Sequence, residues 1–195
     1  VDADTGLDLV RQHIEAAVAV GAKSLRIGSG KYEPSIPYVE QVKKANAQYA
    51  KVAEMAAEYG VRALIETHMG LLTPTVTKTL AVLKGLDPKY VGIMWDPGNQ
   101  VLEGAEVPEM ALSEAGEYLG EVHAKNMQFE PITNKRGQII WRSKWCGLEA
   151  GIVNWPAVMD VLKAIGYDGW VMFEDFSTAL PLDERLAANL AWFKS

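Results

Sequence analysis

The stretch Ala-Leu-Ile-Glu-Thr-His-Met-Gly, residues 63–70, indicates how the chain is organised. Three apolar residues suited to a buried strand lead into Glu66, and Gly70 closes the stretch. Glu66 and His68 are two residues apart, so on an extended strand both side chains point to the same side. A carboxylate buried at the end of an apolar strand is unfavourable unless a cation or hydrogen-bond donors compensate its charge. The stretch therefore predicts a strand that delivers Glu66 to a polar site.

The same layout returns three times downstream. Residues 91–96, 121–125 and 170–175 each form a short apolar run that carries Asp, His or Glu at its end. Four such strand ends in sequence order predict a site assembled at the C-terminal rim of a parallel sheet.

Composition and charge limit the classes of protein to which this chain can belong. The chain has 195 residues, of which 49% are hydrophobic, and this is enough for one substantial core. No apolar run approaches the roughly 20 residues that span a bilayer, and no signal-peptide layout opens the chain. The single cysteine, Cys146, fits a reducing cytosol. A net charge of −6 gives no general attraction to nucleic acid or anionic membranes. We therefore expect a cytoplasmic protein without nucleic-acid or membrane partners.

Hydrophobic periodicity predicts alternating helices and strands. Helices are expected at residues 6–20, 38–59, 75–83, 108–119, 155–165 and 182–193. Strands are expected at residues 24–27, 62–66, 91–95, 121–124 and 170–173, and a long polar loop from the fourth strand to about residue 152. This alternation is typical of βαβ units and of a parallel sheet covered by helices. No linker divides the chain into two domains.

The strand-end residues favour a (β/α)8 TIM barrel, although five strands cannot close one. The chain begins at Val1 and enters a helix almost directly. At ~30 residues per unit, three further units amount to about 90 residues. We expect residues 1–195 to form the C-terminal part of a single barrel domain without its first three strands. The sheet should then stay open, with the missing strands supplied by a further segment or by another chain. A doubly wound sheet is the alternative, but no Gly-rich phosphate loop follows a strand.

Four motifs in sequence order carry a family resemblance. They are Ile-Glu-Thr-His (65–68), Trp-Asp-Pro-Gly-Asn (95–99), Val-His-Ala-Lys (122–125) and Met-Phe-Glu (172–174). The series resembles the sugar phosphate isomerase/epimerase family, the xylose isomerase-like TIM barrel superfamily. Its members include ketose 3-epimerases, hydroxypyruvate isomerases, inosose dehydratases and endonuclease IV nucleases. Residues 147–155 and 166–169 resemble the family's approach to its last strand, so the resemblance covers nearly the whole chain as units four to eight.

The resemblance implies one divalent metal ion, bound by Glu66, Asp96, His123 and Glu174. Three carboxylates and one imidazole suit Mn2+, Mg2+ or Co2+, with Zn2+ as a further candidate. A metal that holds a sugar carbonyl and the neighbouring hydroxyl acidifies the C–H bond between them. Glu66 and Glu174 are then the expected catalytic residues that remove and return the proton.

Each of these residues also has an ordinary structural interpretation. Glu66 fits a salt bridge, Asp96 fits a turn, and His123 fits the histidine of a packed core. Glu174 competes with Asp175, because alternation lets only one of the two side chains face inward. The joint occurrence of four such residues favours a shared metal site over four separate coincidences.

Four further residues are expected to bind the substrate: His68, Asn99, Lys125 and Arg142. His68 and Asn99 could hydrogen-bond hydroxyl groups, whereas Lys125 could neutralise an enediolate or hold a phosphate. Arg142 lies in the expected long loop, where the family often places an anion-binding side chain, although a solvated loop charge is an equal alternative. Trp95, Trp141 and Trp145 would line the sugar pocket or belong to the core.

Asn99 is also a departure from the resemblance. Several epimerases and the nucleases have a histidine three residues after the liganding aspartate, and asparagine is a poor ligand for a second metal. The chain contains only three histidines, which disfavours a trinuclear nuclease site.

The leading functional hypothesis is a metal-dependent isomerase or epimerase of a small sugar or sugar phosphate. An inosose-type dehydratase shares the same first step and stays open as the alternative. A nuclease and a non-catalytic sugar-binding relative are the remaining hypotheses. A small sugar is the expected partner, and a homo-oligomer is compatible with the sequence.

Overall fold

A five-stranded parallel sheet forms the centre of the computed structural model, which describes residues 3–195. Its strands pair in chain order: β1 (Ser24–Arg26), β2 (Arg62–Glu66), β3 (Val91–Trp95), β4 (Leu119–Ala124) and β7 (Trp170–Phe173). The order never reverses, whereas a doubly wound sheet has a point where it does. The sheet is therefore part of a (β/α) barrel, as the sequence predicted.

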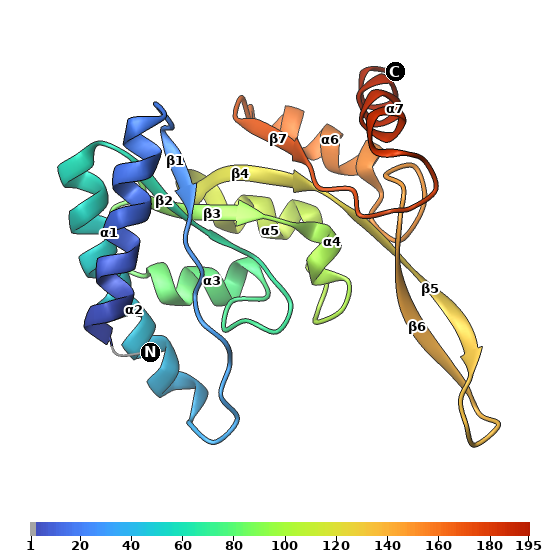
Figure 1. The fold of residues 1–195 in the computed structure, drawn as a ribbon, viewed down its shortest axis with the longest axis horizontal. Helices are drawn as coiled ribbons and strands as arrows, with labels where there is room; N and C mark the ends of the chain where they lie inside the picture. Colours follow the sequence, from blue (N-terminus) through green and yellow to red (C-terminus); the bar gives the residue numbers. More distant parts are fainter. Residues whose placement is uncertain (1–2) are drawn as a thin grey trace.

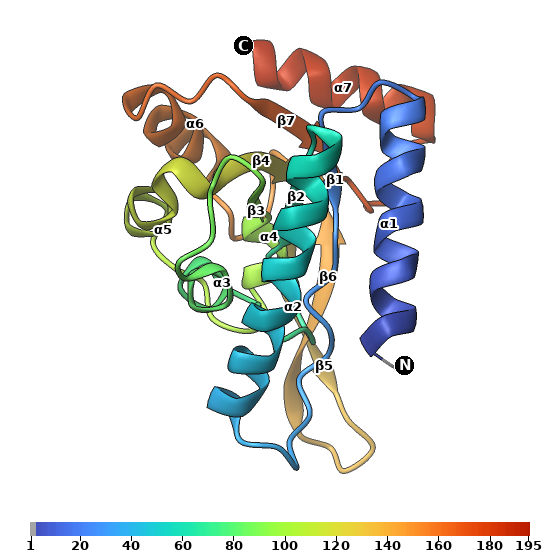
Figure 2. The same ribbon diagram turned by 90° about the vertical axis from the view of Figure 1, so that its left-hand side faces the viewer.

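A row of helices covers the outer face of this sheet (Figures 1 and 2). Neighbouring helices contact one another along the row from α1 to α6. The helices are α1 (Ala3–Ala19), α2 (Tyr38–Tyr59), α3 (Val76–Leu83), α5 (Pro108–Ala115), α6 (Trp155–Ala164) and α7 (Leu182–Lys194). The core lies between the two layers, where Ile65, Ile93 and Val122 of the strands are completely buried. The predicted alternation of strands and helices is confirmed.

Local sequence signals fix several helix ends. Thr75 and Asn154 are the N-cap residues that directly precede α3 and α6. Each side chain accepts a hydrogen bond from a backbone N–H three residues later. Gly60 ends α2 with a left-handed φ of 67°, a conformation that glycine adopts without steric strain.

The prediction of a long polar loop after β4 is wrong. The chain instead forms an antiparallel hairpin of β5 (Asn126–Thr133) and β6 (Ile139–Cys146), which projects away from the sheet (Figure 1). Glu130 separates Phe129 from Pro131 on β5, and Arg142 and Lys144 take alternate positions on β6; this period of two marks a strand. Gly137, with a φ of 77°, belongs to the turn that joins them.

Two smaller differences lie beside β3 and β4. Asp96 begins a single helical turn, α4 (Pro97–Gln100), that the sequence analysis did not predict. The helix expected over residues 108–119 ends at Ala115 and continues as a short 3-10 turn, η1 (Gly116–Tyr118). Strand β4 accordingly begins at Leu119, two residues earlier than expected.

The sheet does not close, because β1 and β7 form its two edges. On its inner face a cavity of about 600 Å³ extends over residues of β1, β3, β4 and β7. Trp170 borders this cavity and is 76% exposed, an unusual state for a strand tryptophan. Within residues 3–195, no helix has the length and apolarity that a membrane span requires.

Candidate metal centre

Four strand ends deliver the residues of the candidate metal centre. Glu66 is the last residue of β2, Asp96 follows β3, His123 lies near the end of β4, and Glu174 follows β7. Parallel pairing aligns these ends, and a hydrogen bond from the Glu174 N–H to the Ala124 carbonyl (2.9 Å) extends the alignment beyond β7. Strands far apart in the sequence thus present their polar ends to one place.

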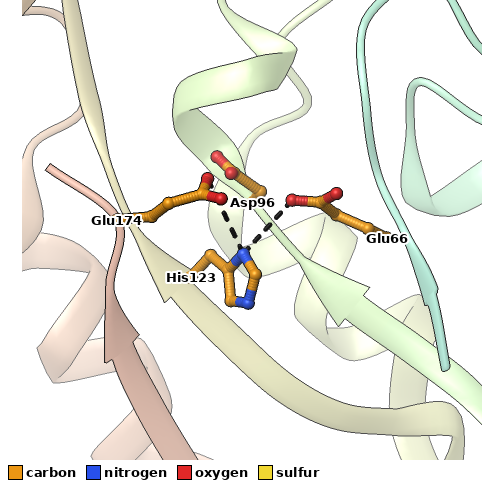
Figure 3. A group of neighbouring side chains, drawn as sticks. All are labelled: Glu66, Asp96, His123 and Glu174. Atoms are coloured by element: carbon orange, nitrogen blue, oxygen red, sulfur yellow. Dashed lines mark hydrogen bonds and ion pairs between the residues drawn. The ribbon is translucent and has the colours of Figure 1, made fainter. Parts of the chain in front are cut away.

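The four side chains converge. One ligand atom from each residue lies within 4.8 Å of the others. In Figure 3, Glu66 on the right and Glu174 on the left both approach the same nitrogen of the His123 ring. The His123 Nδ1 atom is 3.2 Å from Glu66 Oε1 and 3.8 Å from Glu174 Oε2. Glu66, Asp96 and His123 are buried, whereas the Glu174 side chain is 26% exposed. Glu174 is therefore the carboxylate that a ligand can reach most easily.

Burial and charge shift the pKa values in different directions. Burial raises the pKa of Asp96 to about 6, although Lys125 and the Asn99 N–H favour the ionised form. Burial also disfavours the charged forms of Glu66 and His123. Their mutual hydrogen bond and nearby opposite charges outweigh it, so the pKa of Glu66 is lowered and that of His123 is raised. Glu66 is therefore ionised at neutral pH.

Lys125 enters this cluster directly. Its side chain is 2% exposed, and its Nζ lies 2.9 Å from Asp96 Oδ2 and also contacts Glu174 Oε2. Nζ also donates a hydrogen bond of 3.0 Å to Asn99 Oδ1. The structure thus brings Lys125 to the site, where its charge acts on two of the four expected ligands.

Asn99 and Thr67 hold Asp96 in place. The backbone N–H of Asn99 donates to Asp96 Oδ1 and its side-chain Nδ2 donates to Oδ2, both at 2.8 Å. Thr67 Oγ1 accepts a hydrogen bond of 2.8 Å from the Asp96 N–H. A Cβ on Gly98 would lie 2.9 Å from the Lys125 backbone carbon, so only glycine permits this approach of α4 to β4. Asn99 is completely buried and orients Asp96; the expected contact of Asn99 with a substrate stays a prediction.

His68 and Arg142 lie outside the convergent group. His68 follows β2, and its Nδ1 lies 2.7 Å from the Met69 carbonyl oxygen. Arg142 belongs to the projecting hairpin, where its Nε donates a hydrogen bond of 3.1 Å to Glu130. Its side chain is 61% exposed, because β6 carries it away from the strand ends. A substrate-binding role for His68 and Arg142 stays a prediction.

The three tryptophans have separate environments. Trp95 is completely buried in the core, and its Nε1 donates to Gln100 Oε1. Trp141 is 67% exposed on the hairpin. Trp145 reaches the site, where its ring centroid lies 5.1 Å from Lys125 Nζ.

Sequence reasoning missed three residues that contact the cluster. Arg26, at the end of β1, places Nη2 2.6 Å from Glu66 Oε2. Thr67 supports Asp96, and the Phe176 ring lies 5.0 Å from Lys125 Nζ. Arg26 could have been found, because it stands at a strand end as the four expected ligands do. Phe176 carries no such local signal.

The donor set fits a divalent cation. Three carboxylates and a neutral imidazole nitrogen are suitable ligands for Mg2+, Mn2+, Co2+ or Zn2+. Among the described residues, the buried His123 Nε2 has no hydrogen-bond partner, whereas Glu66 Oε2 and Glu174 Oε2 each contact a cationic side chain, Arg26 and Lys125. The three ionised carboxylates outnumber the two positive charges of Lys125 and Arg26. With a neutral His123, the cluster therefore keeps one net negative charge. A cation would therefore be favoured there.

Several relatives from different bacteria are named inosose dehydratases. The protein from Geobacillus thermodenitrificans is 26% identical over 153 residues, which cover 71% of this chain and 49% of the relative. The protein from Lactiplantibacillus plantarum is 30% identical over 146 residues, with coverage of 70% and 48%. The chain thus spans about half the length of these two relatives.

Structural comparison supports the same fold. A crystal structure of the IOLI protein with a bound zinc atom has a TM-score of 0.76 and 18% identity. The match covers 95% of this chain and 66% of that one. The family described as "Xylose isomerase-like TIM barrel" matches residues 2–195, nearly the whole chain. With its consecutive parallel strands and polar strand ends, the chain belongs to the xylose isomerase-like TIM barrel family.

Proposed function

We propose that this chain supplies the metal centre of an enzyme that enolises a small ketose or a polyol-derived ketone. The observation that carries the proposal is the convergence of Glu66, Asp96, His123 and Glu174 at one strand-end site. A divalent ion bound there would polarise the substrate carbonyl and acidify the adjacent C–H bond. The ligand set favours Mg2+, Mn2+ or Co2+, and Zn2+ is also compatible with it.

The two glutamates divide the proton transfers. Glu174 is the more exposed carboxylate, so it can approach the carbon-bound proton of a substrate in the site. Glu66 approaches the same His123 nitrogen from the other side, as Figure 3 shows, and its lowered pKa keeps it ionised. Lys125 would place positive charge beside the substrate oxygen atoms and stabilise the charge that develops during enolisation.

The fate of the enolised substrate distinguishes two activities. Return of the proton to the other face of the same carbon gives an epimer, and transfer of the proton to the neighbouring carbon gives an isomer. Departure of a neighbouring hydroxyl, protonated to water, gives dehydration. The relatives named inosose dehydratase, among them those from Geobacillus thermodenitrificans and Lactiplantibacillus plantarum, favour dehydration of an inosose as the second candidate. The net charge of −6 disfavours a nucleic-acid substrate.

Solvent exchange of the substrate's α-hydrogen tests the shared step. The protein is incubated in D2O with Mn2+ or Mg2+ and either a ketose panel or an inosose, and proton NMR follows the substrate. We expect loss of the α-hydrogen signal, followed by an epimer or isomer with a ketose or by an unsaturated product with an inosose. No exchange with any substrate and either metal ion would contradict the proposal.

A further inference from the structure

The Lys125 ammonium lies within the carboxylate cluster and not at its rim. Its Nζ is 2.9 Å from Asp96 Oδ2 and also contacts Glu174 Oε2. Both oxygens belong to residues of the candidate metal centre. The chain itself therefore supplies a cation to two of the four ligands.

Two aromatic rings border the same ammonium group. The ring centroids of Trp145 and Phe176 lie 5.1 and 5.0 Å from Lys125 Nζ, and 5.7 Å from each other. Aromatic faces attract an ammonium group within about 6 Å of the ring centroid. The rings thus provide a second favourable environment directly beside the carboxylates.

When no metal ion is bound, the buried carboxylates still need a cation close to them. Asp96 is completely buried, and its charge adds to those of Glu66 and Glu174 within a group that spans at most 4.8 Å. A buried charge left without its partner is strongly destabilising. A divalent ion and the Lys125 ammonium would compete for the same oxygen atoms, because two cations at contact distance repel each other.

We propose that Lys125 is the internal counter-cation of the metal-free site. When a divalent ion binds, Lys125 withdraws from Asp96 and Glu174 toward the rings of Trp145 and Phe176. The inference rests on the proposed metal centre but concerns a separate property, the balance between the ion and the lysine. From its position against the rings, Lys125 still faces the site and can contact a substrate oxygen.

The variant Lys125→Met tests the exchange of cations, because methionine keeps much of the side chain's length and removes its charge. Calorimetry with Mn2+ gives the affinity, and thermal unfolding is followed with and without the ion. We expect the metal-free variant to melt about 5–15 °C below the wild type. Its Kd for Mn2+ should be at least about tenfold lower, a change of about 1.4 kcal/mol. On saturation with Mn2+, the melting temperature of the variant should also rise more than that of the wild type.

Lys163→Met is the matched control. Lys163 is 73% exposed on α6, where Nζ lies 3.9 Å from Asp160, so the same change in charge should leave affinity and melting unaltered. Equal or weaker Mn2+ binding by Lys125→Met would overturn the inference and leave the metal centre intact. Absence of binding by every variant and the wild type would overturn the metal centre itself. If Lys125→Met is unfolded without the ion, refolding on addition of Mn2+ supports the inference and failure to refold contradicts it.

Discussion

His123 of β4 reaches across β3 to Glu66 of β2, and its Nδ1 atom lies 3.2 Å from Glu66 Oε1. Burial opposes the charge on both groups, but the bond between them outweighs this effect. It raises the pKa of His123 and, together with Arg26, lowers the pKa of Glu66. The protonated imidazole and the carboxylate therefore stabilise each other, and this bond would compete with metal binding by either residue.

Metal affinity should increase with pH between about pH 5 and pH 8. Binding requires ionised Asp96 and neutral His123, but the pKa of Asp96 is raised to about 6 and that of His123 lies above its ordinary 6.5. Below these values both groups hold protons that the ion must displace. Calorimetry in buffers of different ionisation enthalpy should detect proton release near pH 6. An affinity that does not change over this range would contradict the predicted linkage.

Replacement of Asp96 by Asn should remove metal binding while leaving the fold in place. Asparagine keeps the Oδ1 atom that accepts the Asn99 N–H at 2.8 Å, so the start of α4 survives. It loses the anionic oxygen, and the affinity should fall on the order of 100-fold or more, above the usual effect of outer-shell changes. Circular dichroism and Mn2+ calorimetry measure the two properties. Asp160→Asn on α6, where the side chain is 80% exposed, is the control and should bind Mn2+ normally.

Glu174→Gln should reduce solvent exchange of the substrate's α-hydrogen by about 10²–10⁴-fold, the usual contribution of a general base. Metal and substrate binding should be largely kept, because glutamine retains a side-chain oxygen that is free to bind, whereas the oxygen retained in Asp96→Asn is occupied by the Asn99 N–H. Deuterium incorporation measured by NMR gives the rate.

Asp175→Asn is the matched control for this experiment. The Asp175 carboxylate accepts hydrogen bonds from the Ser177 N–H (2.7 Å) and from Asn189 Nδ2 (2.9 Å), so it is held apart from the metal centre. Exchange should therefore persist in Asp175→Asn. The reverse pattern, with exchange kept in Glu174→Gln and lost in Asp175→Asn, would assign the base to Asp175.

Thr67→Val should destabilise the protein by about 1–3 kcal/mol. Valine matches the shape of threonine but leaves the buried Asp96 N–H without the 2.8 Å hydrogen bond to Thr67 Oγ1. Urea unfolding measures the change in the free energy of unfolding. Thr133→Val, at the exposed end of β5, should change it by less than about 0.5 kcal/mol. Equal stability of the two variants would show that the bond to Asp96 is unimportant.

The sequence determined the five strands of the parallel sheet, most helices and three of the four candidate metal ligands, and left Asp175 as a competitor of Glu174 for the fourth. These features are local, because a period of two or 3.6 residues and a polar residue at the end of an apolar run occupy one short segment. The antiparallel hairpin was missed although its alternation is local, because its polar residues, among them Gln128, Glu130, Arg142 and Lys144, suggested a loop. The resemblance to the family supplied the shared metal, which no single motif specified.

Only the tertiary structure decided between Glu174 and Asp175, because the register that pairs Ala124 with Phe173 sets which carboxylate turns toward the cluster. It also placed Lys125 between Asp96, Glu174 and two aromatic rings, although the sequence showed only that Lys125 shares the face of His123. Such contacts join segments distant in the chain. Their distances depend on how strands align and how loops pack over strand ends, and no local pattern in the sequence specifies these.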